Sequence, residues 1–155
     1  MKKILLFGGI AVALFVTLIV VVQLQNQQQA DGNPFGKSTL AQETIDQLDD
    51  PNYQNVILPE ELDERLADNE DALIYFYSGR CDYCNQATPV LVPMAEDAGA
   101  DLELYNVLEF EEGWNDFDIE GTPTVILFED GEEVDRITGL GPEEEYEQLF
   151  ERAAE

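Results

Sequence analysis

The most prominent pattern in the chain is an uninterrupted apolar run close to its N-terminus. Residues 4–22 contain no charged side chain, and Lys2 and Lys3 come directly before them. As a helix this run would be about 28 Å long, which is close to the roughly 30 Å hydrocarbon core of a bilayer. We therefore predict a transmembrane anchor over residues 4–22. The two lysines place residues 1–3 in the cytoplasm and the rest of the chain outside.

A cleaved signal peptide is the alternative interpretation of this run. The run is longer than most signal-peptide cores, and no clear small-x-small cleavage site follows Val22. Both interpretations place the remainder outside the cytoplasm, and the sequence leaves cleavage open. Residues 23–36 are rich in Gln and then contain Gly and Pro, a composition that predicts a flexible spacer. Residues 37–155 are long enough for one domain.

The hydrophobic pattern of this domain alternates between strand and helix signals. Residues 72–77 form a continuous apolar run, which is typical of a strand buried on both faces. Two further runs flank Glu129-Asp130-Gly131 and predict a hairpin. The predicted strands are 72–77, 101–107, 124–128 and 132–138, with 55–58 as a possible first strand, and the predicted helices are 39–48, 59–67, 81–98, 109–117 and 142–153. This order predicts an α/β fold with a mixed central sheet flanked by helices.

Charge and composition narrow the possible partners. The chain has 7 basic and 34 acidic residues, a formal net charge of -27, and no His. Nucleic acid is not expected as a partner, because binding phosphates needs clustered Lys and Arg. The lack of His removes the commonest metal ligand and general base, so we expect no metal and no cofactor. The residues after Lys3 carry a charge of -29, which suggests saline surroundings or attraction to basic partner proteins.

The chain has two cysteines, and both lie in one short motif. Cys81 and Cys84 follow the predicted strand 72–77 and open the predicted helix 81–98. A C-x-x-C at this place is a redox motif, because backbone N–H groups at the helix start stabilise the first thiolate and the second thiol lies one turn on. A permanent staple is disfavoured because so small a loop removes little unfolded-state entropy. Haem attachment would need His in place of Asn85.

Three stretches of the chain resemble one known family. Residues 73–84 resemble the active-site strand and turn of thioredoxin-like proteins, and Pro89 matches the family's helix-kinking proline. Residues 117–124, with Gly-Thr-Pro-Thr at their end, resemble the loop that carries the family's cis-proline. The resemblance covers about residues 52–153, and it implies a thioredoxin-like fold.

The resemblance also implies roles for individual residues. Cys81 would be the nucleophile and Cys84 the resolving thiol. Pro123 would form a cis peptide bond against the cysteine pair, and the backbone of Thr122 would bind an extended substrate peptide. Pro93 is a second proline in the predicted active-site helix, and we expect it to end that helix early or to bend it.

Departures from the family bear on the direction of electron flow. Tyr75 stands where thioredoxin itself has a buried Asp, which helps to deprotonate the resolving cysteine. Its absence weakens the case for a fast reductase. Arg80 should favour the Cys81 thiolate and Asp82 should disfavour it. Together with Tyr83, these two residues are the predicted redox-tuning positions.

The predicted function is thiol–disulfide exchange on exported or cell-surface proteins, as a disulfide donor or shuffler. We expect a monomer, held to the membrane by its anchor and recycled by a membrane redox partner. One alternative is an extracytoplasmic reductase, for example in cytochrome maturation. Another is an anchored peptide-binding accessory module with little turnover. The sequence identifies neither the substrate nor the recycling partner.

Overall fold

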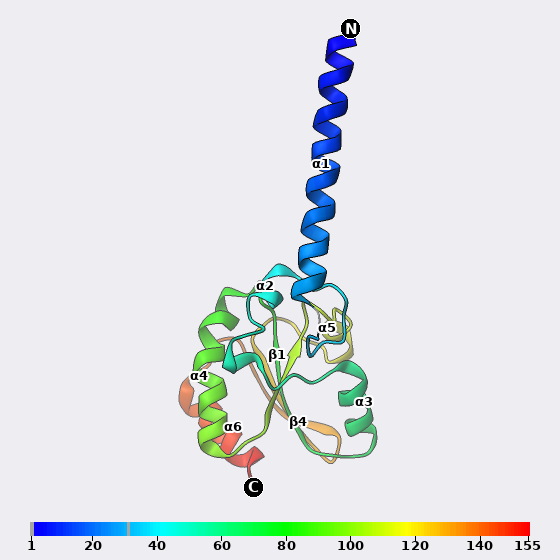
Figure 1. Cartoon of the computed structure of the whole chain (residues 1–155). Helices are drawn as coiled ribbons and strands as arrows, with labels where there is room; N and C mark the ends of the chain where they lie inside the picture. The colour runs from blue at the N-terminus through cyan, green and yellow to red at the C-terminus, as the bar shows by residue number, and fades with distance from the viewer. Residues whose placement is uncertain (1, 31) are drawn as a thin grey trace.

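A four-stranded mixed sheet forms the centre of the domain (Figure 1). The computed structural model describes residues 2–30 and 32–155. The strands are β1 (Ala72–Tyr77), β2 (Leu102–Asn106), β3 (Thr124–Glu129) and β4 (Glu132–Thr138), in the order β2-β1-β3-β4. β1 is parallel to β2 and antiparallel to β3, and β3 and β4 form the predicted hairpin. The predicted mixed sheet is therefore confirmed.

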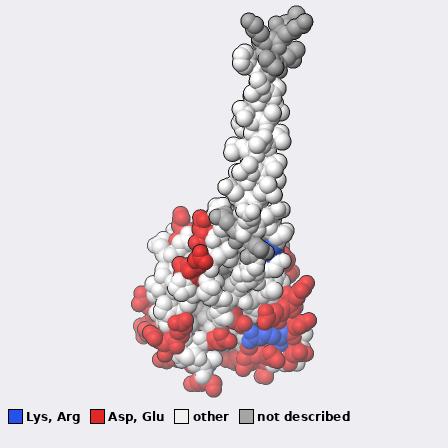
Figure 2. All heavy atoms as spheres, in the orientation of Figure 1, with Lys and Arg blue, Asp and Glu red and all other residues white. Residues whose placement is uncertain are grey.

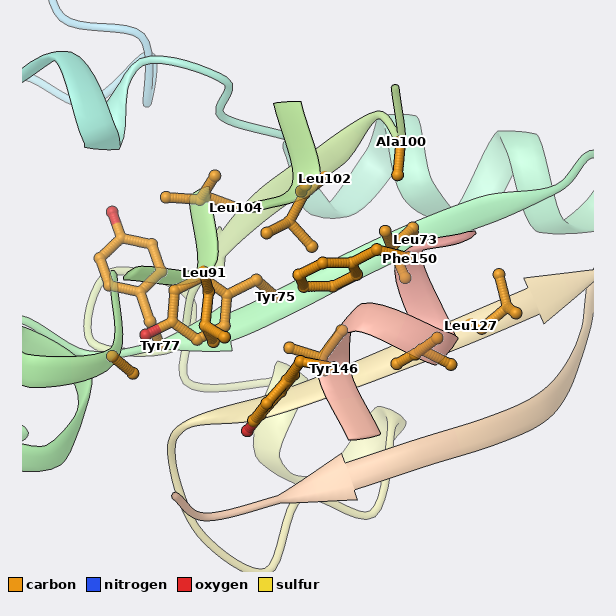
Figure 3. Close-up of a cluster of buried hydrophobic side chains, with 14 of the residues drawn as sticks. Leu73, Tyr75, Tyr77, Leu91, Ala100, Leu102, Leu104, Leu127, Tyr146 and Phe150 are labelled. Atoms are coloured by element: carbon orange, nitrogen blue, oxygen red, sulfur yellow. The ribbon is translucent and has the colours of Figure 1, made fainter. Parts of the chain in front are cut away.

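Helices cover both faces of this sheet. All six residues of β1 are buried, and because successive side chains of a strand point to opposite faces they contribute to two cores. Tyr75 and its neighbours pack under α4 (Asp82–Ala98) and α6 (Glu143–Ala153), as Figure 3 shows for Leu91 and Phe150. Ile74 and Phe76 face α3 (Pro59–Ala67) and the N-terminal segment. The continuous apolar run thus predicted a central strand correctly.

The active-site helix α4 contains two prolines. Pro89 and Pro93 both lie inside it, and both are exposed. The helix nevertheless continues to Ala98, so Pro93 does not end it early, and a bend at Pro93 stays a prediction. Leu91 and Ala95 on its opposite face are buried in the core, and this tertiary packing outweighs the low helix propensity of Pro.

Three predicted elements are shorter than expected. Helix 39–48 is reduced to α2 (Gln42–Ile45), and helix 109–117 to α5 (Gly113–Asp116). The possible strand at 55–58 is a single parallel bridge between Val56 and Leu104. This pairing does not extend further because the chain turns into α3 at Pro59. A 3-10 helix, η1 (Pro51–Tyr53), precedes this bridge.

The N-terminal helix extends beyond the predicted anchor. α1 (Lys2–Gln29) continues through the first half of the predicted spacer, because Gln is a good helix former and Gly and Pro occur only later. Ala30 and Phe35, also in that spacer, are buried. Phe7–Gln28 of α1 is long and apolar enough to cross a membrane. Met1 and Asp31, at the predicted cytoplasmic end and in the spacer, lie outside the described residues. The predicted domain boundaries remain predictions.

Candidate functional site

The cysteine motif lies at one edge of the sheet, where β1 ends. Cys81 is the N-cap residue of α4, and its N–H donates to the Ser78 carbonyl at 3.0 Å, which closes the turn after β1. β3 runs antiparallel to β1 with Thr124 opposite Phe76. The loop that precedes β3 therefore reaches the same edge as Cys81, although about forty residues separate them in the sequence.

The Cys81 sulfur has two backbone partners. Its Sγ accepts a hydrogen bond from the Cys84 N–H at 3.0 Å and donates one to the Thr122 carbonyl at 3.2 Å. The peptide bond between Thr122 and Pro123 is cis, as the resemblance implied. The Cys81 sulfur thus lies at the N-terminus of α4, between a backbone N–H and the cis-proline loop.

The second cysteine occupies a different environment. Cys84 is wholly buried, and both cysteines are free thiols. Burial raises the pKa of the Cys84 thiol to about 12, and its contact with Cys81 adds to the effect, whereas hydrogen bonding with Thr122 and Ser78 opposes it. At neutral pH Cys84 is therefore a thiol rather than a thiolate.

Two hydroxyl groups lie beneath Cys84. Thr88 donates to the Cys84 carbonyl at 2.8 Å, and the Tyr75 hydroxyl lies 3.0 Å from Thr88 Oγ1. Burial raises the pKa of Tyr75 above its usual range, and the neighbouring Cys84 adds to this. Tyr75 therefore stays a neutral phenol here, so this position provides no base that could take up a proton from Cys84.

The three predicted redox-tuning residues have different surroundings. Arg80 Nε donates to Glu43 Oε1 at 3.0 Å, an interaction that raises the pKa of Arg80 and lowers that of Glu43. The guanidinium is thus directed to α2 rather than to Cys81. Asp82 and Tyr83 are exposed on the first turn of α4, with Tyr83 at 62% exposure. Their influence on the redox potential stays a prediction.

Comparison with known proteins decides the family. The model of the thioredoxin family matches residues 54–152. The chain belongs to the thioredoxin family. It is accordingly a thiol–disulfide oxidoreductase.

Individual members of the family are distant relatives. Chloroplastic thioredoxin M4 of Arabidopsis thaliana is 28% identical over 117 residues, which are 74% of this chain and 56% of that protein. The thioredoxin of Mycoplasmoides gallisepticum is 29% identical over 96 residues, 58% of this chain and 91% of that protein. Among solved structures, a mutant thioredoxin from Halobacterium salinarum NRC-1 is 32% identical, with a TM-score of 0.52, over 64% of this chain and 88% of that one.

The sequence did not predict the contacts that reach this site from the chain before the matched thioredoxin segment. Gln47 donates to the Asn85 side chain at 3.2 Å, and Asn85 donates to the Gly79 carbonyl at 3.3 Å. The first of these contacts joins residues 38 positions apart, and no local pattern predicts it. Thr88 could have been found, because it lies one helical turn after Cys84.

Carboxylates and thiols could in principle hold a metal. Within residues 2–30 and 32–155, no three Cys, Asp or Glu side chains are grouped so as to bind one.

Proposed function

We propose that this protein is a membrane-anchored disulfide donor or shuffler for exported or cell-surface proteins. In the reduced form Cys81 is the nucleophile and Cys84 the resolving thiol, and in the disulfide form Cys81 is the sulfur that substrate thiolates attack. The buried, high-pKa Cys84, which lies above a neutral Tyr75, is the observation that carries the proposal.

The proposed reaction transfers two electrons from a substrate dithiol to the cysteine pair. A substrate thiolate attacks Sγ of Cys81, the Cys81–Cys84 bond breaks, and Cys84 leaves and takes up a proton. The second substrate thiolate then attacks the substrate sulfur that is bonded to Cys81. The substrate disulfide forms, and Cys81 is released as a thiolate. The Cys84 N–H and the N-terminus of α4 stabilise that product.

The raised pKa of Cys84 bears on how long a mixed disulfide on Cys81 persists. A reductase needs Cys84 as a thiolate to resolve the mixed disulfide on Cys81. With a pKa of about 12 only a very small fraction of Cys84 is ionised at neutral pH. The mixed disulfide therefore lasts long enough for a substrate thiol to attack it. A persistent mixed disulfide suits a donor or shuffler and slows turnover by the alternative, an extracytoplasmic reductase.

Substrate binding is proposed at the loop before β3. The Thr122 carbonyl already lies 3.2 Å from Cys81 Sγ, so an extended peptide whose cysteine reaches Cys81 would run alongside the backbone of Thr122. Pairing of this kind uses main-chain hydrogen bonds and tolerates many side chains, which suits a substrate class as broad as exported proteins.

The location rests on α1. In Figure 2, the part of α1 that is not grey shows no Lys, Arg, Asp or Glu on its visible surface, whereas the domain below it is densely acidic. Lys2 and Lys3 at the start of the chain favour an orientation with the domain outside the cytoplasm. The proposed recycling partner is accordingly a membrane redox protein.

Two single substitutions test this function. Cys81→Ser should abolish exchange with a dithiol peptide. Cys84→Ser, incubated with the disulfide form of the same peptide, should accumulate a mixed disulfide on Cys81, because Cys81 attacks the peptide disulfide and no second thiol resolves the product. Mass spectrometry of the unreduced protein detects it. A Cys81→Ser variant that retained full function in cells would instead identify the anchored peptide-binding module. The proposal fails if the Cys84→Ser variant traps no mixed disulfide with the peptide.

A further inference from the structure

The anchor helix leaves the domain at the edge that carries the active site. Figure 1 shows α1 rising from the end where α2 lies, opposite the C-terminus. β1 ends at that same edge and leads into Cys81, and α2 contacts the turn between them through Glu43 and Arg80. The cysteine pair and the proposed membrane are therefore on the same side of the domain.

The end of α1 is joined to the domain by specific contacts. The Asn26 side chain donates to the Leu40 carbonyl at 3.0 Å and accepts from the Leu40 N–H at 3.3 Å. Ala30 and Phe35 are buried, and the Phe35 ring lies 6.3 Å from that of Phe110. The paired hydrogen bonds of Asn26 and the buried side chains of Ala30 and Phe35 hold the end of α1 in one orientation relative to the domain.

The contacts continue from this segment to the active-site turn. Lys37 lies over the Phe110 ring at 4.4 Å and forms a salt bridge with Glu109, which also accepts from the Ala41 N–H at 2.9 Å. Next along the chain, α2 lies against Gly79. A Cβ at Gly79 would come within 3.0 Å of Glu43 Cβ. We call residues 26–47, which carry all these contacts, the anchor dock.

The geometry leaves little space between the active-site edge and a bilayer. The predicted anchor ends at Val22, and α1 ends at Gln29. The seven further residues of helix span about 10.5 Å. Because α1 leaves the domain at the end where α2 and the active-site turn lie, this length of helix limits the space between that edge and the bilayer surface.

We propose that the anchor dock holds the C-x-x-C edge toward the bilayer, so that its exchange partner is an integral membrane protein with a dithiol close to the membrane surface. The inference rests on the proposed anchoring and exchange functions. A folded soluble protein would have to enter a gap of about 10 Å. A short loop of a membrane protein that emerges from the bilayer would already lie in this gap. The partner's dithiol becomes a disulfide as the Cys81–Cys84 disulfide is reduced, with two electrons and two protons transferred.

A ruler experiment tests this orientation. The full chain, in its disulfide form, is reconstituted in neutral-lipid vesicles with a transmembrane helical peptide that presents a Cys pair on an outer spacer of varied length. We expect exchange to be fastest with a short spacer. Seven helix-forming residues inserted after Gln25 would lift the domain by about 10.5 Å with little rotation. The optimum should then move to spacers about three extended residues longer.

Two controls separate this inference from the exchange function itself. A soluble peptide with the same Cys pair should react equally with all variants, and if none reacts the proposed function has failed. A Gly-Ser insertion between Gly32 and Asn33, combined with Asn26→Ala, should remove the spacer optimum and lower the peak rate by about tenfold because orientation is lost. An optimum that does not move with the seven-residue insertion would overturn the inference. So would a soluble peptide that reacts faster than every membrane-bound one.

Discussion

Two identical side chains acquire different chemistry here because their surroundings differ. Cys81 is partly exposed at the start of α4, with its sulfur bonded to the Cys84 N–H, whereas Cys84 is wholly buried one turn later. The first sulfur lies at a helix N-terminus beside an N–H donor, and burial raises the pKa of the second. Their proposed division into nucleophile and resolving thiol is thus a consequence of place in the fold.

The raised pKa of Cys84 predicts how its ionisation depends on pH. In a Cys81→Ser variant, the Cys84 thiolate should increase about tenfold per pH unit from neutral pH upward. Burial is the largest cause of the raised pKa and remains in this variant, so no midpoint is expected near pH 9. Thiolate absorbance at 240 nm measures this when the titration of a Cys81→Ser, Cys84→Ser double variant is subtracted, because tyrosinates absorb at the same wavelength. A plateau near pH 9, the value of an ordinary thiol, would show that Cys84 is not desolvated.

The two charged neighbours of Cys81 should differ in their effect on its reduction potential. The guanidinium of Arg80 is held by Glu43, so Arg80→Gln should change the potential by less than about 30 mV, a tenfold change in equilibrium. Asp82→Asn removes a negative charge next to Cys81 and should raise the potential. Equilibration of each variant with glutathione measures both. A larger shift for Arg80→Gln than for Asp82→Asn would contradict this account.

The sequence predicted those site residues that local patterns determine. Cys81, Cys84 and Pro123 belong to short motifs, and the structure places the first two and the cis bond of the third as expected. The pairing of Arg80 with Glu43 could not be predicted, because it depends on where α2 docks. Charge alone therefore did not show that the Arg80 guanidinium pairs with Glu43, and its effect on Cys81 stays a prediction.

At the scale of elements, the important contact is that of α2 with the turn before Cys81. Gly79 in that turn lies so close to α2 that an added Cβ would be 3.0 Å from Glu43 Cβ and 3.2 Å from Gln47 Oε1. A side chain at this position would have to push α2 and the turn apart. This close contact is what joins the anchor dock to the active site.

Gly79→Ala should therefore destabilise the domain by about 1–3 kcal/mol, the usual cost of overpacking. Urea denaturation followed by circular dichroism measures the change. Gly121→Ala is the matched control, because a Cβ at Gly121 has nothing within 4 Å and the residue also lies near the active site. Equal stability of the two variants would show that the contact between α2 and the turn is loose.

Elements were predicted well where a strong local signal and tertiary packing agree. β1 has the predicted bounds because its six apolar residues are all buried in the centre of the sheet. α5 begins only at Gly113, which lies against the ring of Tyr105 in β2, a packing contact that helix propensity does not include. Residues 23–29 were expected to be flexible, since their polar composition gives no sign that α1 continues through them.

The whole molecule is dominated by negative charge. Each of the five basic residues after Lys3 forms a salt bridge with a carboxylate: Lys37, Arg65, Arg80, Arg136 and Arg152. Most of the 34 acidic residues lie beyond these pairs, and Figure 2 shows them over the visible face of the domain. Their mutual repulsion opposes folding and is screened by salt.

The melting temperature of the isolated domain should therefore rise from low salt to molar KCl. Thermal unfolding followed by circular dichroism measures it. Glu96→Gln with Asp97→Asn removes two acidic residues from the last turn of α4, where the helix dipole disfavours them. This variant should melt higher at low salt and show a weaker salt dependence. A melting temperature that does not increase with KCl in the unmodified domain would refute the proposed adaptation to saline surroundings.

The reduction potential of the Cys81–Cys84 pair is the most direct test of the central claim, a disulfide donor or shuffler rather than a reductase. It is measured by equilibrating the soluble domain against glutathione and quantifying the two redox forms. We predict a value well above that of thioredoxin, about -270 mV, toward the value of about -120 mV found for a strong disulfide donor. A potential at or below about -270 mV would contradict the account and identify the protein as a reductant.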